Sequence, residues 1–136
     1  MAAKTLVTCL LLASQTYNVP PVLLAGIYKA EGGRVGQEVG NENGTHDLGP
    51  MQINTLWVPV VAKKWGVSER RARAAIRDNA CTNMSVAAWI LRNHLSETQS
   101  LAKALSYYHS RTPSFGHKYQ DRVLNILREN SLLKSN

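Results

Sequence analysis

The chain has 136 residues, enough for one domain with a sizeable core and too few for a second domain of similar size. A hydrophobic share of 44% is ordinary for a globular protein and excludes a disordered chain. The net charge of +7 favours an anionic partner, but charge alone does not choose among nucleic acid, an acidic membrane surface and an acidic polymer.

The first elements predicted along the chain are two helices. An apolar run predicts a helix over residues 3–17, although a short apolar run near the N-terminus is also typical of a signal peptide. A second helix opens at Pro20–Pro21, since proline suits a first turn, and ends at Glu31, where two glycines break it. No stretch is long enough and apolar enough to span a membrane.

The rest of the chain is predicted to be mostly helical, with a small β-region. Residues 32–50 are rich in Gly and Asn, and Asn43–Gly44 is a dipeptide typical of hairpin turns. A helical segment is predicted from near Met51 and is disturbed by Pro59. Later helices are predicted over residues 68–78, 83–96, 99–110 and 117–130. We therefore expect one α+β, predominantly helical domain, with its core over about residues 5–128 and a polar tail over residues 129–136.

Glu31 is the first candidate for chemistry. Its helical face also carries Leu24, Ile27 and Tyr28, so a carboxylate lies in line with core residues. Burying an unpaired carboxylate is costly, and we therefore expect its pKa to be raised, as a general acid requires. For an arbitrary glutamate, a place at a cleft rim or a capping role is the commoner outcome.

Two further stretches hold candidate binding residues. Gly49 lets the backbone pass close to another element, and the amides of Gln52 and Asn54 can both donate to and accept from sugar hydroxyls and N-acetyl groups. Tyr108 shares a helical face with apolar residues, so it points inward and its hydroxyl needs a partner. A lone inward tyrosine is more often a packing residue, and His109 is more often a surface histidine than a catalyst.

Together and in this order, these stretches resemble lytic transglycosylases of the soluble, goose-lysozyme-like type. The resemblance is greatest to the small members that accompany bacterial secretion and conjugation machinery, and it covers roughly residues 9–127. Two positions depart from the pattern: Gly32 replaces the usual serine after the glutamate, and Pro50 replaces a leucine and removes a backbone N–H. The motifs are Ala30-Glu31-Gly32, Gly49-Pro-Met-Gln-Ile53, Tyr108-His109-Ser110, and Tyr119 with Val123.

The resemblance implies a lysozyme-like fold and cleavage of peptidoglycan glycan strands by Glu31 alone, with no cofactor and no metal. It implies a 1,6-anhydromuramoyl product formed without water. Asp47 stays open, either as a second carboxylate of a lysozyme-type hydrolase or as the cap of a turn. The substrate-binding residues implied are Met51, Gln52, Asn54, Tyr108, His109 and Tyr119.

The two cysteines, Cys9 and Cys81, lack the spacing of a zinc site and can be a disulfide or two free thiols on sequence alone. In the members resembled, a cysteine of the first helix pairs with one ahead of a tryptophan-containing helix, which implies a Cys9–Cys81 bond before Trp89. Residues 5–17 are then a helix of the mature domain, with the export signal already removed. The expected protein is a periplasmic monomer that serves a secretion, pilus or conjugation machine.

Two rival interpretations come from other classes of protein. Gly66, the N-cap Ser68 and the basic helix after it resemble a helix-turn-helix unit, which makes a DNA-binding protein the main competitor. That interpretation leaves Glu31 and the Gly49–Ile53 motif unexplained, and we expect no nucleic-acid partner. A catalytically inactive wall-binding module is the second rival, and the intact Glu31 argues against it.

Overall fold

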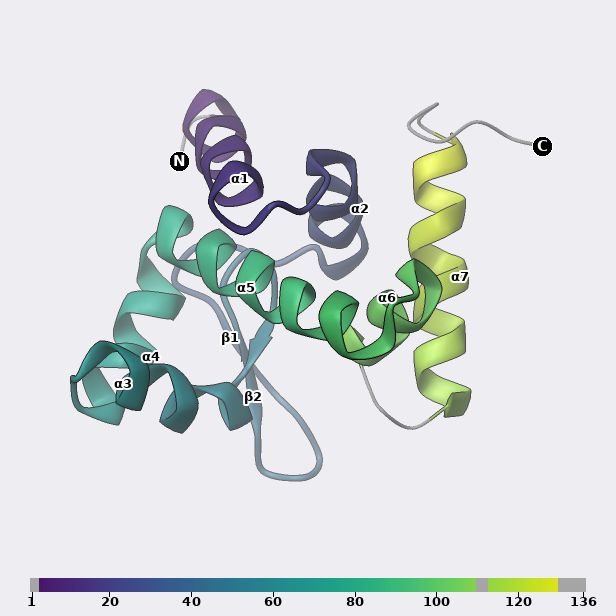
Figure 1. Ribbon diagram of the computed structural model, residues 1–136. Coiled ribbons are helices and arrows are strands. Elements are labelled where there is room, and N and C mark those ends of the chain that lie inside the picture. The colour runs from purple at the N-terminus through teal and green to yellow at the C-terminus, as the bar shows by residue number, and fades with distance from the viewer. Residues whose placement is uncertain (1–2, 110–112, 130–136) are drawn as a thin grey trace.

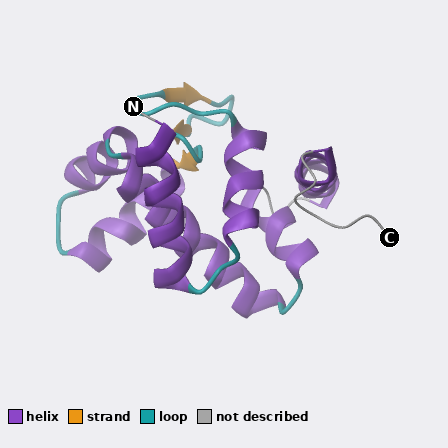
Figure 2. Ribbon diagram, turned by 90° about the horizontal axis from the view of Figure 1, so that it is seen from above, coloured by secondary structure: helices purple, strands orange, loops and turns teal. Residues whose placement is uncertain are grey.

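The computed structural model describes the backbone of residues 3–109 and 113–129, and the side chains of residues 5–108 and 121–129. This part is a predominantly helical α+β fold, as predicted, and its antiparallel strands gather at one side of the helices (Figures 1 and 2). The helices are α1 (Ala3–Tyr17), α2 (Pro21–Glu31), α3 (Val58–Trp65), α4 (Glu69–Asp78), α5 (Ala80–Thr98), α6 (Leu101–His109) and α7 (Pro113–Glu129). The strands are β1 (Glu38–Gly40), β2 (His46–Leu48) and β3 (Ile53–Asn54), followed by a 3₁₀ turn, η1 (Thr55–Trp57).

Helix α5 lies at the centre of the fold (Figure 1). It packs against α1, α4 and α6, while α7 packs against α2 and α6. Burial of the apolar faces of these helices is what holds the domain together, because removal of apolar surface from water is the main favourable term in folding. The largest fully buried side chains are Leu23, Leu24, Ile27, Leu48, Met51, Ile53, Ile76, Met84, Ile90, Leu91, Leu105 and Leu127.

Helix α2 ends where the sequence predicted. Pro21 lies in its first turn, and Gly32 adopts a left-handed conformation with φ of 65° at the C-terminal end. The backbone N–H of Gly32 donates to the carbonyl of Tyr28, which satisfies one carbonyl of the last turn. Glu31 is therefore the last residue of the helix.

The predicted helix from near Met51 is wrong. That segment forms the short strand β3 and the turn η1, and the helix begins only at Val58. The side chain of Asn54 accepts a hydrogen bond from the Leu56 N–H and opens η1. Pro59 lies in the first turn of α3, where a missing N–H costs nothing, so it starts the helix and does not disturb it.

The other predicted helices differ from the observed ones mainly in their bounds. Helix α5 begins at Ala80 because the Asn79 side chain accepts from the Thr82 N–H and caps it. Helix α7 begins at Pro113, earlier than predicted, and the tail beyond Glu129 lies outside the described residues. Within the described part, no helix is both long and apolar enough to cross a membrane.

A disulfide joins Cys9 of α1 to Cys81 in the first turn of α5, with 4.6 Å between the two Cα atoms. This confirms the predicted pairing. Cys9 is buried at the contact between the two helices, so the bond and the packing hold the same pair of elements.

Candidate functional site

A cleft of about 470 Å³ lies where the end of α2, the sheet, η1, α5 and α6 meet. It brings together five of the predicted site residues: Glu31, Asp47, Gln52, Asn54 and Tyr108. The remaining lining residues were not predicted as binding residues, although Asn43 lies in the predicted turn and Ile53 ends the Gly49–Ile53 motif; they are Asn41, Glu42, Asn43, Thr45, Ile53, Trp57 and Ile90.

Glu31 is half-buried at the end of α2 and opens onto this cleft. Ile27 and Leu24, about one and two turns before it, are fully buried in the core. The predicted arrangement of a carboxylate in line with core residues is therefore present. Its position is set by the left-handed Gly32, which ends the helix immediately after it.

The chain after Glu31 runs directly against the Gly49–Gln52 turn. Gly33 is buried there, and a Cβ on it would overlap the carbonyl oxygen of Gly49. Only glycine allows this approach of two backbones. The sequence predicts only that Gly33 helps to break the helix, because this second role depends on a residue distant in the chain.

Gln52 is held by its own turn. Its Nε2 donates to the carbonyl of Gly49 at 3.0 Å, and its backbone has φ of 51°, which is uncommon for a residue other than glycine. A strained backbone at a cleft-lining amide is typical of a site whose geometry matters more than its local stability. Gln52 is thus presented to the cleft in a fixed orientation.

Asn83 of α5 holds the same turn through hydrogen bonds, and it was not among the predicted site residues. Its Oδ1 accepts from the Met51 N–H at 2.8 Å, and its Nδ2 donates to the carbonyls of Leu48 and Ile76 at 2.9 and 3.0 Å. Asn83 is fully buried, so each of these bonds satisfies a group that water cannot reach. The sequence signal for this role was a polar residue among the apolar residues of the buried face of α5.

Gly49 makes room for Asn83. Its φ is 67°, and a Cβ at this position would come within 2.5 Å of the Asn83 Nδ2. The prediction that Gly49 permits a close approach is confirmed. The partner is a side chain of the protein itself.

Tyr108 points inward, as predicted, and its hydroxyl donates to the Met51 carbonyl at 3.1 Å. Burial raises the pKa of this hydroxyl well above its usual value, and the charges of Glu31 and Asp47 raise it further. The hydroxyl therefore stays protonated. Met51 itself is fully buried, so its backbone and not its side chain serves the site.

Asp47 lies on strand β2 and lines the cleft. Its Oδ1 accepts from the Asn54 Nδ2 at 3.2 Å, across the β2–β3 pair. The hairpin turn is held instead by Asn43, whose Oδ1 accepts from the Thr45 N–H at 3.0 Å. Asp47 is thus a strand residue of the cleft wall and not the cap of the turn.

The side chain of Asn54 forms hydrogen bonds with Asp47, Thr45 and Leu56. Besides its bond to Asp47, its Nδ2 donates to the Thr45 Oγ1 at 3.0 Å, while its Oδ1 accepts from the Leu56 N–H at 2.9 Å. These contacts fix the amide and, through it, the Asp47 carboxylate. Asn54 therefore serves as a support of the cleft wall as well as part of its surface.

Trp57 adds an aromatic side chain to the cleft. Its ring meets Trp89 edge-on, with centroids 5.7 Å apart, and meets the buried His94 in a similar arrangement at 6.0 Å. Such edge contacts are favourable and restrict the orientation of the ring.

The predicted site residues His109 and Tyr119 have side chains outside the described residues, as does Ser110 of the third motif.

Comparison with known protein families gives a match over most of the chain. The sequences of curated proteins yield none. The family model described as "Transglycosylase SLT domain" matches residues 8–120, which include the whole cleft lining described above. On this match, which spans most of the sequence, the chain belongs to the transglycosylase SLT domain family.

Proposed function

We propose that this protein is a peptidoglycan lytic transglycosylase that cleaves the β-1,4 bond between N-acetylmuramic acid and N-acetylglucosamine. Family membership supports this activity in general. The observation that carries the assignment to residues is the cleft position of Glu31, at the end of α2 and together with Gln52 and Tyr108.

The chemistry needs one carboxyl group that first gives and then takes a proton. Protonated Glu31 donates its proton to the glycosidic oxygen as that bond to the muramic C1 breaks. The substrate's own 2-acetamido group stabilises the positive charge that develops at C1. The Glu31 carboxylate then takes the proton of the C6 hydroxyl as O6 bonds to C1. The product is a 1,6-anhydro sugar, no water is consumed, and Glu31 ends protonated as it began.

The neighbours of Glu31 suit the binding of a neutral sugar. The fixed amide of Gln52 and the protonated hydroxyl of Tyr108 provide groups near the reacting acetamido group. Tyr119 is assigned to steady Glu31 and His109 to contact substrate on the resemblance of their motifs alone.

A second candidate is lysozyme-type hydrolysis with two carboxylates. It is favoured by one observation: Asp47 lines the same cleft as Glu31, and the charges of both raise the pKa of Tyr108. Mass spectrometry of muropeptides from purified wall separates the two reactions, because the products differ by one water. We expect anhydro products, and mainly hydrated products would assign the chain to the hydrolytic class.

We further propose that the protein works in the periplasm, as a monomer, and locally opens the wall for a secretion, pilus or conjugation apparatus. The disulfide supports an oxidising compartment. The Tyr108-His109-Ser110 motif supports the specialised role by resemblance. In cells lacking the gene, we expect loss of apparatus assembly that the wild-type protein restores and the Glu31→Gln variant does not.

A further inference from the structure

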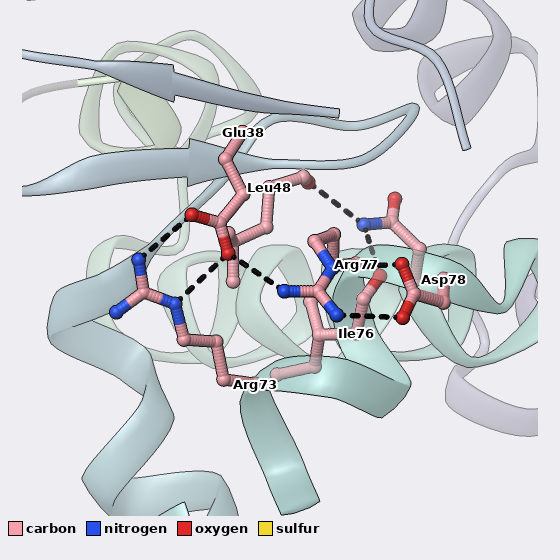
Figure 3. Close-up of polar contacts among 7 residues, drawn as sticks. Glu38, Leu48, Arg73, Ile76, Arg77 and Asp78 are labelled. Atoms are coloured by element: carbon pink, nitrogen blue, oxygen red, sulfur yellow. Dashed lines mark hydrogen bonds and ion pairs between the residues drawn. The ribbon is translucent and has the colours of Figure 1, made fainter. Parts of the chain in front are cut away.

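The basic helix α4 divides its arginines between two environments. Arg70 and Arg71 are exposed, whereas Arg73 and Arg77 reach toward the sheet and bind the carboxylate of Glu38 on β1 (Figure 3). The helix that resembles a DNA-binding element in sequence thus directs half of its arginines inward. In the sequence, Arg73 lies 35 positions and Arg77 lies 39 positions after Glu38.

The geometry of the contact is that of a strong ion pair. Arg73 binds in a forked manner, with Nε 3.0 Å from one Glu38 oxygen and Nη2 2.9 Å from the other. Arg77 adds Nη1 at 3.1 Å and is itself fixed by Asp78, whose two oxygens accept at 2.7 Å each. These four residues, Glu38, Arg73, Arg77 and Asp78, are called the Glu38 clamp below.

The Glu38 clamp stays charged over the working range of a protein. Hydrogen bonds from Arg73 are the largest cause that lowers the pKa of Glu38 to about 2, and Arg77 acts in the same direction. The Glu38 side chain is 25% exposed, so the pair is partly shielded from solvent. The Gly36 N–H also donates to the Arg77 carbonyl at 2.8 Å, which ties the chain before β1 to the same helix.

The clamp and the cleft lie on opposite faces of one hairpin. Glu38 pairs with Leu48 and Val39 pairs with Asp47 in the antiparallel β1–β2 ladder. Residues opposite each other share a face and successive residues alternate, so the Glu38 side chain is directed away from the face that carries Asp47. The α4 side of the hairpin is thus attached, while its tip and its other side line the cleft with Asn41, Glu42, Asn43, Thr45 and Asp47.

The β1 side of the hairpin has fewer attachments than the β2 side, which pairs with β3 and is bonded to Asn54 and Asn83. Strand β1 has three residues, of which Val39 and Gly40 are exposed. Short isolated hairpins are marginally stable in water, so attachment to the rest of the protein decides where they lie. Asn83 holds β2 at Leu48, whereas the Glu38 clamp holds β1.

We propose that the Glu38 clamp is a positioning device for glycan binding, which sets the place of strand β1, and with it the hairpin tip, relative to Glu31 and to the β2 side that carries Asp47. The inference rests on the proposed function only in taking a glycan strand as the ligand of the cleft. Arg73 and Arg77 act through the hairpin and do not themselves touch the substrate.

The test compares Arg73→Gln with Arg70→Gln, the same change at an exposed arginine of the same helix. Both are made in the wild type, for kinetics, and in a Glu31→Gln background, for binding of an N-acetylglucosamine tetrasaccharide without turnover. We expect Arg73→Gln to weaken binding and raise KM by about 5–30-fold, the factor equivalent to about 1–2 kcal/mol. We expect kcat to change less and the Arg70→Gln control to leave both unchanged.

Two further variants separate positioning from stability. Arg73→Lys keeps the charge but not the forked geometry, so it should restore binding only in part. Glu38→Gln combined with Arg73→Gln should be no worse than Glu38→Gln alone, because Glu38→Gln already removes the ion pair with Arg73 as well as the one with Arg77. A variant with a lower Tm but binding equal to Arg70→Gln, measured well below its Tm, would show a purely structural role and overturn the proposal.

Hydrogen exchange keeps the test independent of the proposed function. If the wild-type cleft binds no tetrasaccharide, the glycan assignment fails and the clamp is tested by exchange alone. We expect faster amide exchange in residues 38–48 of Arg73→Gln than of Arg70→Gln, with α1 unchanged. Equal exchange in the two variants would mean that the clamp does not hold the hairpin.

Discussion

The hydroxyl of Tyr108 donates a hydrogen bond to the backbone carbonyl of Met51, 3.1 Å away, and so ties α6 to the turn that presents Gln52. The same turn is held from below by Asn83 through the Met51 N–H. Both polar groups of the Met51 backbone are therefore used by side chains from two different helices. The part of the cleft nearest Glu31 is built as a rigid turn and not as a free loop.

Replacement of Glu31 by glutamine should abolish most activity. The amide keeps the shape of the side chain but can neither give nor take the proton, and general acid–base catalysis contributes about 10²–10⁴-fold. Clearance of a cell-wall suspension measures the effect, with Glu69→Gln at an exposed position of α4 as control. A folded Glu31→Gln protein with near-wild-type clearance would contradict the assignment.

Replacement of Tyr108 by phenylalanine should destabilise the protein and lower its activity. The change leaves the buried Met51 carbonyl without its donor, and a typical hydrogen bond contributes about 0.5–1.5 kcal/mol. Denaturant unfolding measures the loss, with Tyr17→Phe outside the cleft as control. An unchanged midpoint for Tyr108→Phe would show that the bond contributes nothing.

The alkaline stability of the protein should depend on Tyr108. Its pKa is raised in the folded state, while in the unfolded state the hydroxyl ionises near 10.0. The unfolded state therefore loses the proton first, and stability falls as pH rises above about 10. Unfolding from pH 8 upward should show a shallower decline in Tyr108→Phe than in the wild type; equal slopes would count against the raised pKa.

Removal of the disulfide should cost a few kcal/mol of stability. The two cysteines are 72 residues apart, and closing a loop of this length stabilises by roughly 2–5 kcal/mol on the chain-entropy estimate. The Cys9→Ser, Cys81→Ser double variant avoids a leftover free thiol, and its Tm should fall clearly below that of the wild type. Two reactive thiols in unreduced, denatured wild-type protein from an oxidising compartment would show that the bond does not form.

Replacement of Asp47 by asparagine should leave substantial activity if the product is the anhydro sugar. Glu31 then suffices, and the amide oxygen of the new asparagine can still accept from the Asn54 Nδ2, so the negative charge is the main loss. Asn54→Ala is the informative companion, because it removes the partner of Asp47 and leaves the carboxylate in place. Loss of activity in Asp47→Asn together with hydrated wild-type products would give Asp47 a catalytic role.

Much of this arrangement is visible in the sequence, because it depends on local signals. Helix ends follow from glycine and proline, and the place of Glu31 follows from the 3.6-residue period of α2 together with Gly32. Tyr108 could be oriented from its helical face, and the Asn43–Gly44 dipeptide indicated the hairpin that forms. The Cys9–Cys81 pairing came from resemblance to a family and not from spacing.

The remaining features depend on contacts between distant residues. The Glu38 clamp and the three bonds of Asn83 join elements that no periodicity brings together. Strand β3 has two residues, too few for an alternating pattern to be seen. Pro59 misled because its effect depends on where the helix begins, and it falls in the first turn of α3.

The disulfide also determines how the chain is connected once its backbone is cut. Cys9 and Cys81 enclose the segment that contains Glu31, Asp47, Gln52 and the exposed hairpin tip. A single cleavage by a protease anywhere between the two cysteines leaves both pieces joined through sulfur. A cleavage between Cys81 and Tyr108 instead leaves the piece with Tyr108 without a covalent link to the rest. A nick at the hairpin tip therefore does not separate Glu31 from Asp47 under oxidising conditions.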